Sequence, residues 1–238
     1  LGKIVVNGDY AGRAIPEVAQ ITTHLLGIPP YPAVYVDEYG NKTIVVRVIN
    51  YPMAERIGKM ISVASFGLVG GASFAITGRE MKKAIIPNTL SECYEIGKVL
   101  REAREKKEDP AIAVAKKMNG WVLFKGIVKK KEWEDREGYM WGTTYIDGID
   151  EFQGHTSRIW FKNENHIMWF DDKVIATSPD IIEVIDSVTG EPITNTELKE
   201  GMKVSVVGLK GREQFRTSKG LEILGPKHFG FDIDYIPI

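Results

Sequence analysis

The pattern of hydrophobic and polar positions changes its period near residue 119. Before this point apolar residues recur at helical spacing, as Met53, Ile57 and Met60 do, and β-branched runs lie between the helical stretches. After it, short β-branched and aromatic runs alternate with turn signals at short, fairly even intervals. We therefore predict an α+β protein of two domains, an α/β domain over residues 1–119 followed by a mostly β, barrel-like domain over residues 120–238.

The first domain carries clear helix starts. Pro16 precedes Glu17, Thr77 is a plausible N-cap, and Asp109 precedes Pro110, which is the residue order that opens helices. The expected helices are residues 16–26, 52–66, 77–85, 90–106 and 110–118, and the expected strands are residues 2–6, 33–37, 43–49 and 70–76. The second and third strands form a hairpin around Gly40-Asn41.

We predict that the second domain consists of many short strands. Turn dipeptides such as Asp147-Gly148, Thr189-Gly190 and Lys210-Gly211 separate them. The expected strands are residues 121–124, 127–128, 139–146, 158–162, 167–170, 173–176, 181–185, 204–207 and 221–224. Their number and spacing are typical of a barrel or a sandwich.

The charge balance argues against polyanionic partners. Lys and Arg number 31 against 32 Asp and Glu, for a net charge of −1. Such a chain has no broad attraction for nucleic acid or anionic membrane, and core packing explains most of its aromatic residues. We predict no nucleic-acid and no membrane partner. The many Lys, Glu and Ile residues, with three Gln, suggest a thermophilic source.

The single cysteine, Cys93, cannot form an intramolecular disulfide. No apolar run approaches the ~18–20 residues that span a bilayer, and the first residues lack the layout of a signal peptide. Together these features favour a cytoplasmic location. Because Cys93 lies in a helical pattern, we expect a buried, inert thiol.

Strong catalytic and metal motifs are absent from the sequence. It contains no Walker loop, no GxSxG elbow, no CxxC and no HExxH. The four histidines are scattered, with no pair at a metal-ligand spacing of three or four residues. We therefore predict no metal site, and no cofactor is evident.

The densest polar stretch is residues 7–17, between an expected strand end and a helix start. Ligands of α/β proteins often bind at such places, because free backbone N–H groups point outward there. Asp9 could act as a base, Arg13 could clamp a carboxylate or a polarised carbonyl, and Glu17 could supply a second carboxylate. The alternative is a loop that an Asp9–Arg13 pair holds, with Gly12 turning the chain.

Three further polar features lie in the second domain. Residues 163–166 separate two aromatic strands and read either as a site or as a polar hairpin turn. Asp180 is an isolated acid that could simply end a loop. The aromatic tail, residues 225–238, carries His228 and Asp232, and we expect it to dock on the body of the protein rather than fray.

At these stretches the sequence resembles the S-methyl thiohydantoin desulfurase family, which is associated with hydantoinase and oxoprolinase proteins. The similar stretches are residues 9–17, 161–165, 189–194, 225–226 and 229–232, together with the Gly120-Trp121 opening of the second domain and the Tyr235-Ile236-Pro237 ending. The resemblance implies an α/β domain followed by a β-barrel-like domain. It also implies that residues 1–119 are the C-terminal portion of a larger family domain, without the usual front segment and its glycine-rich stretch.

The resemblance further implies hydrolysis of a C–S or C–N bond in a five-membered cyclic amide, such as an S-methyl thiohydantoin or a hydantoin-like ring. Such chemistry needs a base for water, a donor for developing negative charge and an acid for the leaving group. We expect Asp9 or Glu17 as the base, Arg13 as the stabiliser and an acid from the β domain, in a cleft between the halves. The expected catalytic residues are Asp9, Arg13, Glu17, Glu164, His228 and Asp232, and the expected substrate-binding residues are Asn7, Gly12, Asn165 and Asp180.

The alternative function is a non-catalytic ligand-binding or accessory subunit of a hydantoinase-type assembly. In both cases the expected ligand is a small molecule. The expected macromolecular partners are a second copy of the chain or a hydantoinase-type subunit.

Overall fold

The computed structural model describes Gly2 and residues 4–238, which form two compact units. The larger, here called the half-barrel unit, contains the residues up to Asn7, Gly12–Pro16 and Asn88–Ile238. The smaller, here called the small unit, contains Gly8–Ala11 and Glu17–Pro87. Helices 90–106 and 110–118 thus belong to the same compact unit as the large sheet, and the domain boundary at residue 119 stays a prediction.

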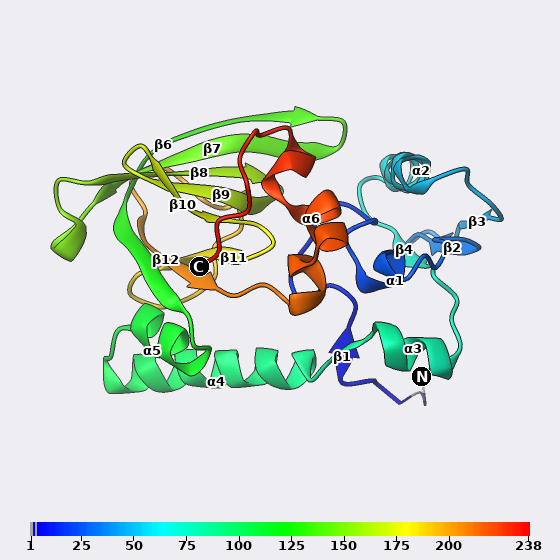
Figure 1. Ribbon diagram of the computed structural model, residues 1–238, viewed down its shortest axis with the longest axis horizontal. Helices are drawn as coiled ribbons and strands as arrows, with labels where there is room; N and C mark the ends of the chain where they lie inside the picture. The colour runs from blue at the N-terminus through cyan, green and yellow to red at the C-terminus, as the bar shows by residue number, and fades with distance from the viewer. Residues whose placement is uncertain (1, 3) are drawn as a thin grey trace. The chain divides into compact units, whose positions relative to one another are not determined.

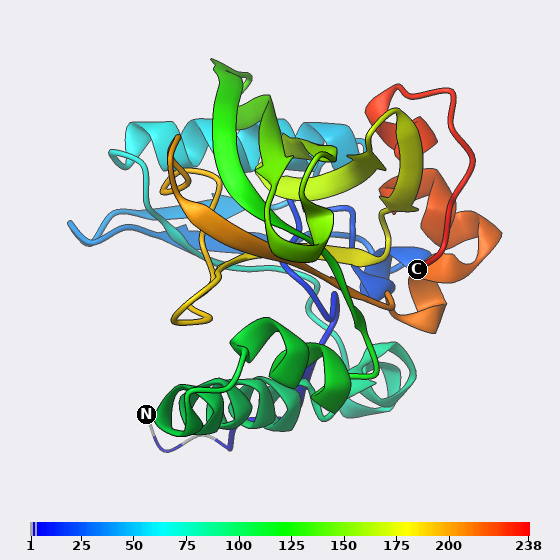
Figure 2. The same ribbon diagram turned by 90° about the vertical axis from the view of Figure 1, so that its left-hand side faces the viewer.

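The half-barrel unit is built on one curled antiparallel sheet of seven strands (Figures 1 and 2). The strands follow the order β10-β9-β8-β7-β6-β12-β11. Their bounds are β6 Trp121–Arg136, β7 Tyr139–Gly148, β8 Thr156–Lys162, β9 Glu164–Phe170, β10 Lys173–Thr177, β11 Ile181–Asp186 and β12 Lys203–Leu209. The predicted fold class, an α/β part followed by a barrel-like β part, is confirmed.

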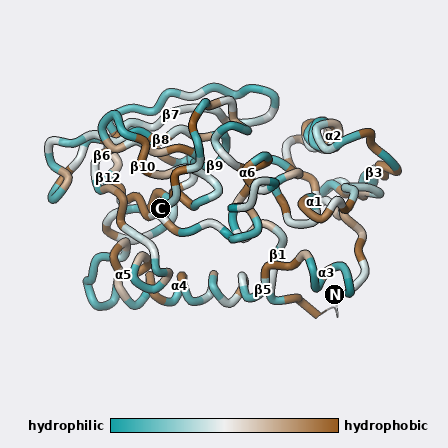
Figure 3. Tube along the Cα trace, viewed as in Figure 1, coloured by the Kyte–Doolittle hydropathy of each residue, from teal (hydrophilic) through white to brown (hydrophobic). Residues whose placement is uncertain are grey.

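Alternation along the strands creates the core. Successive side chains of a strand point to opposite faces of its sheet, and the inner set here is apolar and fully buried. It includes Phe124 of β6, Ile146 of β7 and Ile159 of β8, each at most 1% exposed. Hydrophilic residues gather instead at the tip of the β6–β7 hairpin (Figure 3). The two predicted strands 121–124 and 127–128 are one long strand, with a bulge between Val128 and Lys130.

Two helices cover the outer side of β6, β11 and β12, at the bottom of Figure 2. They are α4 (Thr89–Lys106) and α5 (Pro110–Lys117). The carboxylate of Asp109 caps α5 by accepting from the backbone N–H groups of Ala111 and Ile112, as its sequence predicts. Cys93 of α4 is exposed, so the prediction of a buried thiol is wrong: it lies outside the stripe of α4 that packs on the sheet.

The C-terminal segment contains η2 (Glu213–Arg216), α6 (Ser218–Leu224), η3 (Pro226–Phe229) and an extended tail. The strand predicted at 221–224 is wrong, because those residues end a helix. Thr217 caps α6 by accepting from the Gly220 N–H. A short apolar run such as residues 221–224 is compatible with either a strand or a helix.

The small unit contains a three-stranded antiparallel sheet of order β3-β2-β4, with α2 along one side of it (Figures 1 and 2). The predicted hairpin, helix 52–66 and the Thr77 cap of α3 are confirmed. The bounds are β1 Gly8–Asp9, α1 Thr22–Leu25, β2 Ala33–Val36, β3 Lys42–Val45, α2 Tyr51–Ala64, β4 Gly70–Ala72, α3 Gly78–Ala84 and β5 Ile86–Pro87.

Two predictions near the N-terminus are wrong. The strand predicted over residues 2–6 falls partly on Lys3, outside the described residues, and residues 4–6 form no strand. The helix predicted from residue 16 begins only at Thr22. In the residues before Thr22, side chains accept the backbone hydrogen bonds instead. The Glu17 N–H donates to the Gln20 side chain, and the Val18 N–H donates to the Glu55 carboxylate.

Within the described residues, no helix combines the length and the hydropathy that a membrane span requires.

Candidate functional site

Arg13 enters the half-barrel unit on the short segment Gly12–Pro16 and is bonded to its backbone. Its Nη1 donates to the carbonyl oxygens of Pro179 (3.0 Å) and Asp180 (2.9 Å), and its Nη2 to that of Asn165 (3.2 Å). Its Nε donates to the carbonyl oxygen of Ala14 (3.1 Å). The guanidinium therefore ties the start of β9 to the segment that leads into β11.

Asn165 and its neighbours reinforce this junction. The Asn165 Nδ2 donates to the carbonyl oxygen of Ile182 on β11 (3.0 Å), and its Oδ1 accepts from Asn195 (3.0 Å). A second N–H of the Asn195 amide donates to the carbonyl oxygen of Asn163 (2.7 Å). The side chains of Asn165, Asn195 and Arg13 thus join the start of β9 to the start of β11.

Three carboxylates, those of Glu164, Glu183 and Asp180, lie within electrostatic range of Arg13 at this junction. Ile182 and Val184 are buried in the half-barrel core, so Glu183 between them is on the outer face of β11. Burial raises the pKa of the Glu183 carboxyl from 4.5 to about 7; the Arg13 charge opposes this rise, and Glu164 adds to it. Glu183 therefore exchanges its proton near neutral pH, which is what general acid–base chemistry requires.

His166 is a neutral histidine buried beside this cluster. Its ring is fully buried, 3.9 Å between centroids from Phe229, and neither ring nitrogen makes a hydrogen bond of normal geometry among the described residues. Burial, followed by the charge of Arg13, lowers its pKa well below the ordinary value, and the Lys162 backbone opposes the shift. Since it stays neutral, His166 adds no charge to the Arg13 cluster.

Asp180 is fully buried, and its carboxylate holds the tail. It accepts from the Gly211 N–H (2.7 Å), the Tyr235 hydroxyl (2.9 Å) and the Ile238 N–H (2.8 Å). Burial, followed by the bond to Asp180, raises the pKa of Tyr235 to about 12. These contacts give Asp180 a structural use, and the prediction that the tail docks on the body is confirmed.

Four predicted site residues thus meet in the half-barrel unit: Arg13, Glu164, Asn165 and Asp180. Asn7 lies elsewhere, with its Nδ2 donating to Ser91 Oγ (2.8 Å) at the start of α4. Gly12 has a φ of +66°, and a Cβ there would lie 2.5 Å from Nε of Arg212. Only glycine fits that turn without strain.

The remaining predicted residues are distributed as follows. His228 and Asp232 are exposed on the tail, where the His228 ring lies 5.0 Å between centroids from Phe229. Asp9 and Glu17 belong to the small unit, and the Asp9 carboxylate there accepts from the Ala11 N–H (2.7 Å). Their catalytic roles stay predictions.

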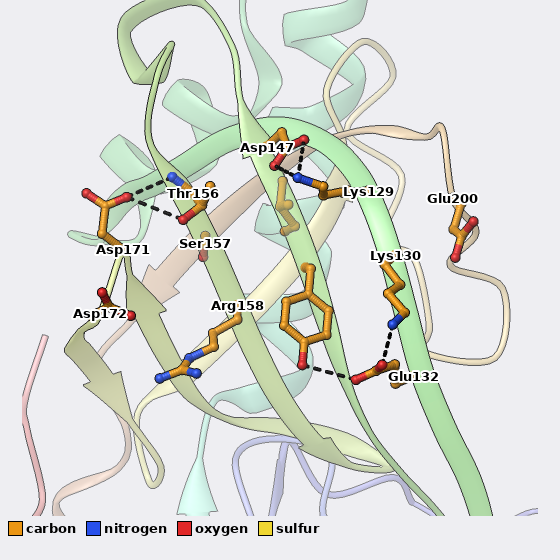
Figure 4. Close-up of a pocket in the computed structure, with 12 residues that line it drawn as sticks. Lys129, Lys130, Glu132, Asp147, Thr156, Ser157, Arg158, Asp171, Asp172 and Glu200 are labelled. Carbon is orange, nitrogen blue, oxygen red and sulfur yellow. Dashed lines mark hydrogen bonds and ion pairs between the residues drawn. The ribbon is translucent and has the colours of Figure 1, made fainter.

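A trough of about 820 Å³ crosses the outer face of β6, β7 and β8 (Figure 4). Its walls carry the ion pair of Lys129 with Asp147 (3.3 Å) and that of Lys130 with Glu132. The Tyr145 hydroxyl donates to Glu132 (3.1 Å), and burial, followed by this bond, raises the pKa of Tyr145. The trough has the size of a small-molecule site.

A second cavity of about 530 Å³ lies further along the same face and is mainly aromatic. Trp160 is its centre, with ring centroids 5.8 Å from Trp141, 5.6 Å from Phe229 and 4.8 Å from Phe231. The docked tail therefore supplies one wall of this groove.

No group of three or more His, Cys, Asp or Glu residues in the described part of the chain is arranged to hold a metal ion.

Sequence reasoning missed Glu183 and passed over His166. The signal for Glu183 was available, since it is the only charged residue in the apolar run 181–185. A lone acid in an otherwise buried strand needs a partner, which only the fold identifies as Arg13.

The fold and the site define a two-part protein with an α/β segment and a curled antiparallel half-barrel that carries a buried arginine–carboxylate cluster. Residues 1–47 match the family model for the S-Me-THD-like N-terminal domain, and residues 49–238 match that for the S-Me-THD-like C-terminal domain. The chain therefore belongs to the S-Me-THD-like family, that of S-methyl thiohydantoin desulfurase, as its motifs predict.

A crystal structure of a protein from Chromobacterium violaceum has the same fold. The two align with a TM-score of 0.79 at 20% sequence identity, over 100% of this chain and 67% of that one. No curated protein matches the chain.

Proposed function

We propose that this chain takes part in the hydrolysis of a cyclic amide of the thiohydantoin or hydantoin type, with Glu183 as its general base. The observation that supports this most directly is the pKa of Glu183, about 7, in a carboxyl that lies near Glu164 and Arg13. A base is most effective when its pKa is close to the working pH. Membership of the S-Me-THD-like family supports the substrate class.

In this proposal Glu183 removes a proton from water, and the oxygen bonds to the ring carbon that carries the S-methyl group. The C–S bond then breaks, and the thiolate leaves as methanethiol with the proton that Glu183 returns. The proton of the added hydroxyl passes to the ring nitrogen that was doubly bonded to this carbon, and the product gains a carbonyl there. With a hydantoin-like ring the same attack on a ring carbonyl breaks a C–N bond, and the proton goes to the ring nitrogen.

Arg13 acts here as a positioning residue. Four of its N–H groups donate to backbone carbonyl oxygens, so it fixes the ends of β9 and β11. Its charge opposes the rise in the Glu183 pKa and so keeps a useful fraction of that carboxyl ionised near neutral pH.

The test is Glu183→Gln, assayed with an S-methyl thiohydantoin by the thiol released and with a hydantoin by ring opening. We expect a loss of roughly 100-fold or more in kcat, the ordinary contribution of a general base. The wild-type rate should rise with pH through an apparent pKa near that of Glu183, about 7. Glu197→Gln, at an exposed carboxylate, is the matched control. Turnover by Glu183→Gln at the wild-type rate would refute the role of Glu183.

The second candidate is a subunit that binds such a ring without turning it over. It is favoured by the four backbone hydrogen bonds of Arg13, since they give the guanidinium near Glu183 a structural role. Ring binding by the wild-type chain, with no thiol release and no ring opening at any pH, would select this candidate.

A further inference from the structure

The strand register brings together one row of four side chains, three of which, Lys130, Tyr145 and Arg158, line the trough of Figure 4. Lys130 of β6 pairs with Tyr145 of β7, Tyr145 with Arg158 of β8, and Arg158 with Trp169 of β9. Directly paired residues of neighbouring strands point to the same face of a sheet. Two cations and two aromatic rings therefore lie side by side on the outer face.

The cations of the trough are not equivalent. Lys129 is paired with Asp147, and Lys130 with Glu132. The guanidinium of Arg158 lies 4.6 Å from the centroid of the Trp169 ring, and among the described residues it has neither an ion pair nor a hydrogen bond. Its Nε is buried without an acceptor. Figure 4 draws no hydrogen bond or ion pair between Arg158 and the other residues that line the trough.

This environment suits a planar anion. The Trp169 ring orients the guanidinium and covers one of its faces, which leaves its N–H edge for a ligand. A carboxylate matches that edge with two parallel hydrogen bonds. The Nη groups of Arg158 have no acceptor among the described residues, and a bound carboxylate would supply one.

The acids of the trough restrict the ligand further. Asp171 is engaged by His155 (2.9 Å) and the Thr156 N–H (2.8 Å), whereas Asp172 has no ion pair among the described residues. Acidic side chains repel a multiply charged anion such as phosphate and attract an ammonium group. A ligand with one carboxylate and one ammonium group fits both charges.

We propose that this trough binds an amino acid or a similar small zwitterion, with its carboxylate on Arg158 and its ammonium group toward Asp172. The site is independent of the role proposed for Glu183. The cavity, at about 820 Å³, has ample room for a ligand of this size.

The experiment is calorimetric titration of the whole chain with L-leucine, L-leucinamide, N-acetyl-L-leucine and inorganic phosphate. We expect leucine to bind, leucinamide and phosphate to show no binding, and N-acetyl-leucine to bind more weakly than leucine. Equal binding of leucinamide, or binding of phosphate alone, would overturn the carboxylate assignment. Equal binding of N-acetyl-leucine would overturn the contact with Asp172.

The decisive variant is Arg158→Gln, which we expect to weaken leucine binding roughly tenfold or more, the usual effect of losing charged hydrogen bonds. Arg136→Gln is the matched control, because Arg136 also stacks on a tryptophan of this face, Trp141 (4.2 Å), but is paired with Glu134 (3.6 Å). Arg158→Lys keeps the charge without the fork and should bind with intermediate affinity. Unchanged binding by a folded Arg158→Gln protein, with its fold checked by circular dichroism, would overturn the proposal.

Discussion

The two units of this chain differ in how completely they bury their apolar residues. The half-barrel unit has a core of fully buried strand residues and a second cluster under α4 and α5. In the small unit the buried hydrophobic side chains among the described residues are Ala33, Val48, Ala84 and Ile86. Helix α2 has none, although its sequence is amphipathic. An apolar stripe alone therefore makes a helix but not a core, which needs apolar faces that cover each other.

Exposed apolar side chains of the small unit show the same difference in burial between the two units. Ile44, Val46 and Phe66 are 64%, 73% and 84% exposed, in contrast to the inner face of the half-barrel. Local stability follows buried apolar contacts, so the half-barrel strands should open much less often than β2, β3 and β4. Four predictions test this contrast in stability and the Arg13 cluster of the half-barrel unit.

The largest expected effect comes from the half-barrel core. Phe161→Ala removes a fully buried ring from β8 and should lower the free energy of unfolding by about 3–5 kcal/mol. Ile44→Ala, in the exposed face of the small unit, should change it by less than about 0.5 kcal/mol. Urea unfolding followed by circular dichroism measures both. Equal losses would mean that the two units do not differ as their burial indicates.

Arg13→Met comes next. It removes the hydrogen bonds from Arg13 to the carbonyl oxygens of Asn165, Pro179 and Asp180, and it removes the positive charge of Arg13 from among the neighbouring carboxylates. We expect a loss of about 2–4 kcal/mol in the same unfolding assay. Arg13→Lys, which keeps the charge but not the planar fork, should lose about half as much. A neutral result for Arg13→Met would show that the junction of β9 and β11 does not depend on this side chain.

The pH dependence of stability isolates Glu183. Its pKa is about 7 in the folded chain, above the ordinary 4.5, so the folded state holds more protons than the unfolded state between these values. Stability contributed by this group is therefore full below about pH 4.5 and is lost as the pH rises through 7. Glu183→Gln should match the wild type at pH 4 and exceed it by about 1–3 kcal/mol at pH 8.

Glu200→Gln, at an exposed carboxylate, is the control for this pH experiment and should follow the wild type throughout. A Glu183→Gln protein with the same pH profile as the wild type would place the pKa of Glu183 at its ordinary value.

The smallest effect concerns a cap in the small unit. Thr77 accepts from the Glu80 N–H, and the Glu80 carboxylate accepts from the Thr77 N–H (2.8 Å). Thr77→Ala should cost about 1 kcal/mol, whereas Thr77→Ser should cost little. Hydrogen exchange should show faster opening of α3 with unchanged protection of β8. Faster exchange in β8 as well would mean that the two units unfold as one.

The sequence by itself determined the local elements of this protein. Alternating apolar residues predict the strands of the half-barrel, and Thr77 and Asp109 predict two helix starts, because these signals act over a few neighbouring residues. Where a local signal was ambiguous, prediction failed. The run 221–224 became a helix, and residues 16–21 formed no helix because side chains of Gln20 and Glu55 satisfy their backbone.

Only the tertiary structure decided the chemistry of the sites. Arg13 meets the β9 and β11 segments across more than 150 residues of sequence, as its bonds to Asn165 and Asp180 show. Glu183 acquires its high pKa, and Arg158 its place against Trp169, from neighbours on other strands. Desolvation and charge depend on distance in space rather than along the chain, so no pattern of neighbouring residues could reveal them.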